Sequence, residues 1–390
     1  MRLFTETGAI SLNHAGEQLC GDRVEVIREN DRTLTMVLAD GLGSGVKANI
    51  LSTLTSKILC TMIAGGMPIE DCVDTIVKTL PVCSVRQVAY STFTILRITD
   101  GTRAELIQFD NPNVILLRGG KSIEYPIEAH EIAGKTVLQS QIALQPHDVL
   151  VAMSDGAIFA GNKQTMNYGW QRDDIIAYLE RLYDNSFSAK MLAAFVVDEC
   201  SRLYAGAPAD DTTIAAVRIR EAQTVNLMMG PPADPRDTDK MMEAFFSQEG
   251  ARIVCGGTTS QLAAEHLHES VATVQDRTAD PAIPPIGRIK GIDLVTEGVV
   301  TMRRAVEYAK AFAENTDLVN LWNVQTDGAA LIAQRLLEQA TEVRFFIGKA
   351  VNPAHQEPGL PIGFGVKIRL VQELAGYLEL LGKRVSIQYF

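Results

Sequence analysis

Residues 37–48 have the sequence VLADGLGSGVKA, and they decide how the first half of the chain folds. An apolar run ends at the carboxylate of Asp40, three glycines follow at alternate positions, and a helical pattern continues to about Met62. This order is typical of a strand, a tight loop and a helix. Oxygen atoms of Asp40 and of the Gly41 carbonyl suit a hard divalent cation such as Mg2+ or Mn2+. Taken alone, however, Asp-Gly is also a common turn dipeptide.

The composition indicates a globular protein of two domains, because 390 residues exceed one ordinary core. The net charge of -11 argues against nucleic acid or an anionic membrane as a partner. Residues 1–13 lack the features of a secretory signal, and no window approaches the roughly 20 apolar residues that span a bilayer, so we expect a cytoplasmic protein. The six cysteines have no Cys-x-x-Cys spacing and fit reduced thiols better than zinc or disulfides.

A second aspartate is expected beside Asp40. Asp22 stands at the start of an alternating strand over residues 23–28, and a short turn at residues 29–31 links it to the strand that ends at Asp40. In an antiparallel hairpin the start of one strand lies beside the end of the next. The sequence therefore predicts that Asp22 and Asp40 are neighbours.

Acidic residues recur at the ends of two later strands. An apolar run leads into Asp155-Gly156, which repeats the first motif, and Asp210-Asp211 precede another strand. A cluster of carboxylates costs free energy through mutual repulsion unless cations neutralise it. Two divalent ions would neutralise this cluster and create a site for phosphoryl chemistry. Any one of these acids, taken by itself, is also explained as a turn or cap residue.

The remaining pattern of the first half predicts an α+β fold. Helical spacing of apolar residues marks helices over residues 46–62 and 69–80. Short strands are expected at 91–98, 103–109, 114–118, 122–125 and 136–143, and further helices at 173–183 and 189–203. A run of short strands after a helical pair favours antiparallel layers over a βαβ repeat.

The order of these motifs resembles a known family. The metal motifs of the PP2C protein phosphatases, in their bacterial SpoIIE/RsbX-like branch, are similar to four stretches of this sequence: Cys20-Gly21-Asp22, Asp40-Gly41-Leu42-Gly43-Ser44-Gly45, Ser154-Asp155-Gly156 and Asp210-Asp211-Thr212-Thr213. The resemblance covers residues 1–220 and implies a sandwich of two antiparallel sheets flanked by helices. Members of this branch act on phosphorylated regulators of sigma factors and stress complexes, so the implied partner is a phosphorylated regulatory protein.

The resemblance also implies which residues hold two Mn2+ or Mg2+ ions and act through them: Asp22, Asp40, Asp155 and Asp210. Asp40 would bridge both ions, and Gly41 would add its carbonyl oxygen. Asp155 and Asp210 would ligate one ion, and Asp22 would hold the other. Asp211 falls where relatives often carry Asn, so we expect it to support the ligands from behind.

The implied reaction is direct hydrolysis of phosphoserine or phosphothreonine on a bacterial regulatory protein, with attack by a hydroxide between the metals. Eukaryotic relatives carry a His after Asp-Gly as a proposed proton donor, whereas this chain has Leu42. Water or another residue must then protonate the leaving group, and His14 and His147 are candidates only because they lie near the motifs in sequence. The alternative is a catalytically silent, phosphatase-like scaffold that binds a phosphorylated regulator.

Residues 221–390 are expected to form a second domain of the α/β class. Strands are predicted at 224–229, 251–255, 292–298, 342–347 and 384–389, and helices at 238–248, 262–267, 300–312, 328–339 and 367–381, with an irregular excursion over 271–287. Strands separated by helices favour an open, mainly parallel sheet. This half resembles no family that we recognise.

A glycine turn stands out in the second half. Gly256-Gly257-Thr258-Thr259 follow a strand and precede a helix, where backbone N–H groups and the helix dipole suit an anion. The same glycines are equally explained as a turn that lets strand and helix pack closely. Glu297 and residues 349–355 are expected at the same carboxyl edge of the sheet, where ligands gather in such folds. The second domain is thus a candidate module for sensing a small ligand or binding a partner.

Overall fold

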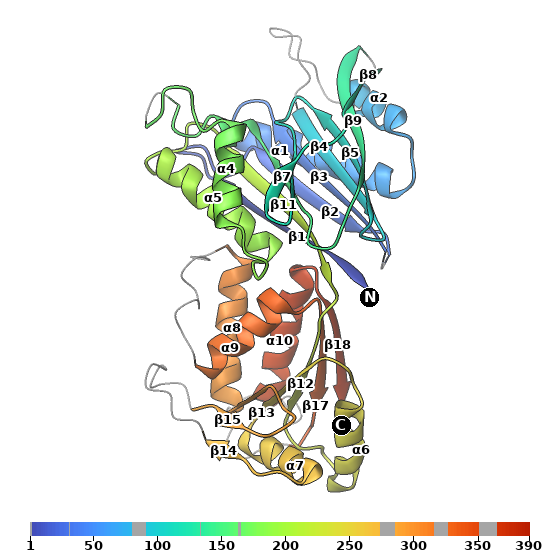
Figure 1. The fold of residues 1–390 in the computed structure, drawn as a ribbon, viewed down its shortest axis with the longest axis vertical. Coiled ribbons are helices and arrows are strands. Elements are labelled where there is room, and N and C mark those ends of the chain that lie inside the picture. The colour runs from blue at the N-terminus through green and yellow to red at the C-terminus, as the bar shows by residue number, and fades with distance from the viewer. Residues whose placement is uncertain are drawn as a thin grey trace. The chain divides into compact units, whose positions relative to one another are not determined.

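The computed structural model describes residues 2–30, 32–79, 91–132, 134–162, 165–273, 285–315, 327–350 and 365–390. The chain divides into two compact units, Met1–Glu221 and Ala222–Phe390, each of which is described by itself below (Figure 1).

The first unit contains two antiparallel sheets. The six-stranded sheet has the order β2-β3-β4-β5-β9-β8 and the five-stranded sheet the order β1-β11-β10-β6-β7. The strands of the first sheet are β2 (Asp22–Arg28), β3 (Thr33–Gly41), β4 (Ser91–Thr99), β5 (Arg103–Phe109), β8 (Glu128–Ile132) and β9 (Lys135–Ala143). Those of the second are β1 (Leu3–Leu12), β6 (Ile115–Arg118), β7 (Lys121–Ile123), β10 (Val149–Met153) and β11 (Thr212–Glu221).

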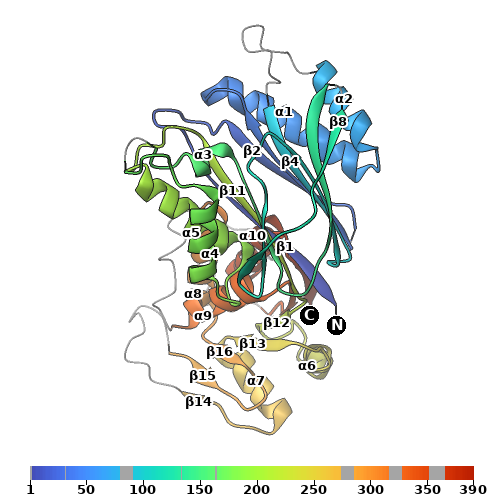
Figure 2. The same ribbon diagram turned by 45° about the horizontal axis from the view of Figure 1, so that its top comes forward.

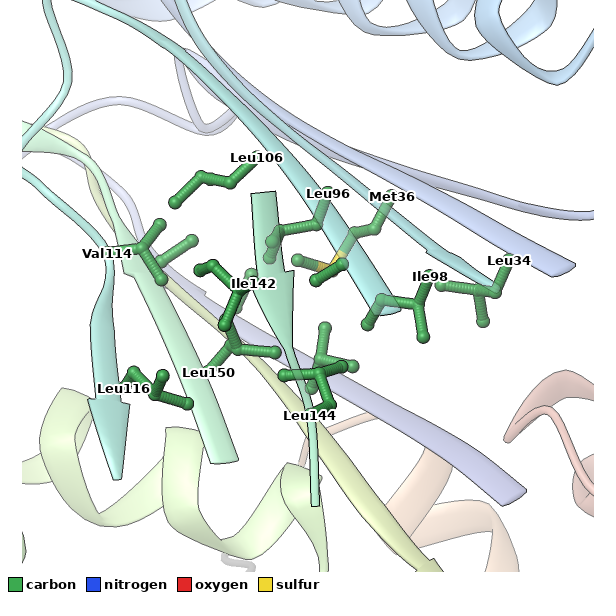
Figure 3. Close-up of a cluster of buried hydrophobic side chains, with 14 of the residues drawn as sticks. Leu34, Met36, Leu96, Ile98, Leu106, Val114, Leu116, Ile142, Leu144 and Leu150 are labelled. Atoms are coloured by element: carbon green, nitrogen blue, oxygen red, sulfur yellow. The ribbon is translucent and has the colours of Figure 1, made fainter. Parts of the chain in front are cut away.

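The main core of this unit lies between the two sheets. Leu34 and Met36 of β3 belong to the same buried cluster as Leu116 of β6 and Leu150 of β10 (Figure 3). Alternate residues of a strand face opposite sides of the sheet, so β3 buries Leu34 and Met36 here and turns Val37 into a second core beneath the helices. This sandwich confirms the predicted fold class.

Helices cover the outer faces of the sandwich. Helices α1 (Gly45–Ala64) and α2 (Ile69–Thr79) lie on the six-stranded sheet, and α5 (Ala189–Leu203) packs on β1 and β11 of the other (Figure 2). Helix α4 (Arg172–Leu182) adjoins β7, and the short α3 (Asp155–Ile158) contacts β11.

The sequence pattern found helix α1, but the apolar residues at helical spacing in its first half are exposed. Val46, Ile50 and Leu54, which recur at helical spacing, are 63%, 53% and 46% exposed. The buried face includes Ser52 and Thr55, whose hydroxyls donate to backbone carbonyls of the preceding turn. Because small polar residues fill this face, apolar spacing alone could not identify it. Strand β8 was also missed, since its residues are mostly exposed and not apolar.

The second unit holds a seven-stranded sheet in the order β14-β15-β16-β13-β12-β17-β18. Its strands are β12 (Thr224–Met229), β13 (Ala251–Cys255), β14 (Ala272–Thr273), β15 (Gly287–Arg288), β16 (Leu294–Thr296), β17 (Glu342–Ile347) and β18 (Arg384–Tyr389). The five strands from β16 to β18 in this order are parallel, and β14 and β15 add an antiparallel edge. The predicted mainly parallel sheet is confirmed.

Helices α6 (Thr238–Phe246) and α7 (Gly257–Leu267) pack together, and α8 (Val299–Ala313) contacts both α9 (Gly328–Ala333) and α10 (Val366–Leu380). Helix α7 begins earlier than the predicted residue 262, because the glycine turn itself forms the first helical residues. Residues 334–339 continue α9 as a π-helix. Much of the predicted excursion at 271–287, residues 351–355 of the predicted edge loop, and Cys83 lie outside the described residues. None of the described helices is long and apolar enough to cross a bilayer.

Candidate metal centre

The hairpin of β2 and β3 places two carboxylates opposite each other. Asp22 and Asp40 are direct cross-strand partners at the open end of this hairpin. The next strand holds β3 at the same end, where the hydroxyl of Ser91 donates to the Asp40 carbonyl at 2.8 Å. The predicted proximity of Asp22 and Asp40 is therefore present in the structure.

Two further aspartates lie at the same place. A cavity of about 410 Å3 is lined by His14, Asp40, Leu42, Gly43, Ser44, Ser91, Thr92, Asp155, Ala209 and Asp210. Asp155 is the first residue of α3, directly after β10, and Asp210 lies in the turn before β11. Thus three of the four predicted ligands, which come from different parts of the chain, face one cavity.

Burial and mutual repulsion raise the pKa values of these acids. The pKa of Asp40 rises to about 10, first because burial removes water from the carboxylate and then because Asp22, Asp155 and Asp210 are negatively charged. Burial also raises the pKa of Asp210 to about 6, with Asp155 adding repulsion. The pKa of Asp155 is raised by burial and is lowered in part by hydrogen bonds with Asp40 and the Gly156 backbone. The raised pKa values mean that the carboxylate cluster is stabilised when it binds protons or cations.

Asp22 lies deeper than the other acids and is 3% exposed. Its Oδ2 accepts a hydrogen bond from Ser154 Oγ at 2.7 Å, and Ser154 Oγ accepts one from the Thr213 backbone N–H at 2.8 Å. Burial raises the pKa of Asp22 to about 7, although the Ser154 and Thr213 hydrogen bonds oppose this rise. Its Oδ1 is buried and has no hydrogen-bond partner among the described residues. Sequence analysis named Ser154 only as part of the Ser154-Asp155-Gly156 motif and gave it no role.

Asp211 is buried behind the cluster. It is 2% exposed, and its Oδ1 accepts a hydrogen bond from the His14 backbone N–H at 2.9 Å. Its Oδ2 faces Gly21, where an added Cβ would lie only 2.6 Å away. Asp211 thus holds the backbone at His14 and packs against Gly21, and its expected supporting role behind the ligands remains a prediction.

Gly41 packs against helix α1. A Cβ at Gly41 would approach the Ala48 carbonyl oxygen to 2.2 Å, so only glycine lets β3 and α1 come this close. The Gly41 N–H donates to the Gly21 carbonyl at 3.2 Å and ties the metal loop to the segment before Asp22. The role of the Gly41 carbonyl as a ligand remains a prediction.

The donor set suits Mg2+ or Mn2+ because it consists of oxygen atoms and includes Oδ1 of Asp22, which has no hydrogen-bond partner in the described part of the chain. Among the described residues, however, no group of three His, Cys, Asp or Glu side chains is arranged to enclose an ion.

The structure separates the two candidate histidines. His14 lines the cavity, and its Nδ1 is buried without a partner among the described residues. His147 lies at the start of β10, where its backbone N–H donates to the Ile219 carbonyl at 2.6 Å, and it does not line this cavity. Only the fold could decide between them, since both lie near motifs in sequence.

An antiparallel sandwich with aspartates clustered at strand ends is the arrangement that the resemblance to the PP2C phosphatases implies. Residues 30–220 match the family model described as Stage II sporulation protein E (SpoIIE). This region is therefore a SpoIIE-type phosphatase domain.

Among curated proteins, the chain is 27% identical over 221 residues to Stage II sporulation protein E of Bacillus subtilis (strain 168), covering 55% of this chain and 25% of that protein. The chain thus spans about a quarter of this relative's length. A solved structure of the PP2C phosphatase domain and a regulatory fragment of B. subtilis SpoIIE has a TM-score of 0.48 at 23% identity, with 56% of this chain and 64% of that chain covered. A structure of RsbX in complex with magnesium has a TM-score of 0.39 at 20% identity, with 55% and 95% covered.

Proposed function

We propose that this protein is a metal-dependent serine/threonine phosphoprotein phosphatase. The observation that carries the proposal is the convergence of the carboxylates of Asp40, Asp155 and Asp210 on one cavity, with Asp22 as the cross-strand partner of Asp40. The negative charge of each carboxylate disfavours ionisation of the others, so gathering four aspartates here does not stabilise the fold. They are explained by cations bound between them.

Asp22, Asp40, Asp155, Asp210 and the Gly41 carbonyl would hold two Mn2+ or Mg2+ ions. Bound ions of this kind supply an activated water and offset negative charge on phosphoryl oxygens. The chain's own contribution is to position the ligands: β3 and α1 fix Asp40 through the close contact at Gly41, and Ser154 orients Asp22. Asp211 holds the backbone of His14, whose side chain lines the same cavity and would lie near a phosphate group bound there.

The proposed substrate is phosphoserine or phosphothreonine on a regulatory protein, encountered in the cytoplasm. The SpoIIE-type domain supports this substrate class. The second unit, which lies outside the matched residues, is proposed to be a regulatory or targeting module.

The test is hydrolysis of p-nitrophenyl phosphate and of a phosphoserine peptide by the full chain with EDTA, Mg2+ or Mn2+. We expect turnover that depends on the divalent ion and is lost in Asp40→Asn. The matched control is Asp173→Asn, which alters an exposed aspartate in the first turn of α4 and should keep full activity. Turnover in EDTA equal to that with metal would refute the proposal.

The second candidate is a silent scaffold that binds a phosphorylated regulator. Metal binding by the wild type without hydrolysis of either substrate would favour it. In that case Asp40→Asn should still bind a phosphorylated partner, whereas an enzyme is defined by turnover that this substitution removes.

A further inference from the structure

The carboxyl edge of the parallel sheet in the second unit has a topological switch point. Strand β12 is first in sequence and central in the sheet; the chain then forms β13 and β16 on one side, and β17 and β18 on the other. The connections after β12 and β17 therefore leave toward opposite sides, and ligands of open α/β sheets bind at such points. The residues that follow these two strands are Gly230 and Gly348.

The two loops touch each other and the side chain of Lys367. A Cβ at Gly348 would lie 2.0 Å from the Pro231 carbonyl oxygen, and a Cβ at Gly230 would lie 2.2 Å from Lys367 Nζ. Lys367 belongs to the first turn of α10, and its ammonium donates to the Ala350 carbonyl at 3.1 Å. Because Gly230 and Gly348 have no side chains, the two loops can pack closely and the Lys367 ammonium can lie at the switch point.

The ammonium of Lys367 is poorly compensated. Burial lowers its pKa to about 8. No carboxylate of the described chain forms an ion pair with it, and the single bond to Ala350 uses one of three donors. A partly buried cation that has no counter-charge among the described residues is costly, and a bound anion removes this cost.

The N-terminus of α7 is tied to the same point. The hydroxyl of Thr259, which is 1% exposed, accepts a hydrogen bond from the Gly230 N–H at 2.8 Å. Helix α7 has Gly256 as its N-cap, no side-chain cap and no acid in its first turn. A Cβ at Gly257 would meet nothing within 4 Å, so the space beside this turn is open. Its free N–H groups and the helix dipole favour an anion there.

An acceptor lies on the neighbouring loop. Gly298, the N-cap of α8, packs on the glycine turn, since its Cβ would lie 3.3 Å from the Gly256 Cα. The preceding residue, Glu297, has a buried Oε2 without a hydrogen-bond partner in the described part of the chain. A hydroxyl on a ligand would satisfy this oxygen.

We propose that this edge binds the phosphate group of a small organic ligand that also carries hydroxyl groups. Lys367 and the first turn of α7 contact the phosphate, and Glu297 accepts a hydrogen bond from a hydroxyl. The site belongs to the second unit and does not depend on the proposed phosphatase activity.

The test is amine labelling of the full chain with an acetylating reagent at pH 8 in EDTA, measured by peptide mass spectrometry. Saturating inorganic phosphate should lower modification of Lys367 several-fold and leave Lys240, an exposed lysine of α6, unchanged. Ribose 5-phosphate should protect at a lower concentration than inorganic phosphate. Unchanged labelling of Lys367 with both probes overturns the site, and equal protection by both probes overturns the role of Glu297.

A charge-matched pair of variants tests the contact with α7. Gly257→Asp places a carboxylate in the open space beside the first turn and should abolish protection of Lys367, whereas the neutral Gly257→Asn should retain it. Full protection in Gly257→Asp would exclude the α7 N-terminus from the site. The wild-type labelling decides the proposal even if these variants fold poorly.

Discussion

The hydroxyl of Ser154 donates a hydrogen bond of 2.7 Å to Oδ2 of Asp22, and the two residues are 132 positions apart in the chain. This bond joins the five-stranded sheet, where Ser154 follows β10, to the six-stranded sheet, where Asp22 begins β2. One carboxylate oxygen of Asp22 is thereby held in place while the other remains without a partner among the described residues. The two sheets of the sandwich thus meet at the proposed metal centre.

We predict that Ser154→Ala destabilises the protein by about 1–3 kcal/mol, because it leaves the buried Asp22 carboxylate and the Thr213 N–H without this partner. Urea unfolding at pH 7 measures the change. Ser247→Ala is the control, since Ser247 is exposed and its hydroxyl makes only local hydrogen bonds, to the Ala244 carbonyl and from Gln248 Nε2, and it should shift stability by less than about 0.5 kcal/mol. Equal effects of the two substitutions would contradict the prediction.

We predict that the metal-free protein loses stability as pH rises. Asp40 has a pKa raised to about 10, so the folded state binds more protons than the unfolded state between about pH 4 and pH 10. The raised pKa values of Asp22 and Asp210 also make the folded state lose stability as pH rises, up to about pH 7 for Asp22 and about pH 6 for Asp210. The urea midpoint in EDTA should fall from pH 5 to pH 9.

In Asp40→Asn the urea midpoint should depend less on pH, because the substitution removes the carboxylate with the most strongly raised pKa. The variant should therefore be more stable than the wild type at pH 9 in EDTA. Saturating Mn2+ should flatten this pH dependence in the wild type by replacing the protons. Identical slopes for wild type and variant would show that Asp40 is not the group responsible.

Arg118 and Asp148 form an ion pair in which the Asp148 side chain is 0% exposed and that of Arg118 is 30% exposed. We predict that Arg118→Met costs about 2–4 kcal/mol, because it leaves the buried carboxylate without its bidentate cation. The control is Arg32→Met, which breaks an exposed pair with Asp100 and should cost about 0–1 kcal/mol. Urea unfolding of both variants checks the difference, and similar costs would argue against it.

We predict that Gly41→Ala destabilises the protein by about 1–3 kcal/mol and lowers phosphatase activity, because its Cβ would force α1 away from β3 at the Ala48 carbonyl. Gly376→Ala is the matched control: Gly376 lies inside α10, and its Cβ would meet nothing within 4 Å. That substitution should stabilise by about 0.5–1 kcal/mol. Thermal unfolding and the activity assay measure both, and wild-type activity in Gly41→Ala would disprove the close contact.

The sequence by itself determined most of the helices and strands and their order, although it missed β8, β14 and β15. Strands such as β13 and β17, and helix α5, lie at the predicted residues because periodicity and turn residues are local signals. It also determined that Asp22 lies beside Asp40, since a short turn between two strands fixes which ends meet.

Only the tertiary structure decided which side chains share an environment. It brought His14 but not His147 to the cavity with Asp210, and it turned Val46 and Ile50 of α1 outward. It likewise placed Lys367 against Gly230, although 136 residues separate them in the sequence. These outcomes depend on how distant segments pack and on which oxygen or nitrogen finds a partner, and local sequence carries no signal of either.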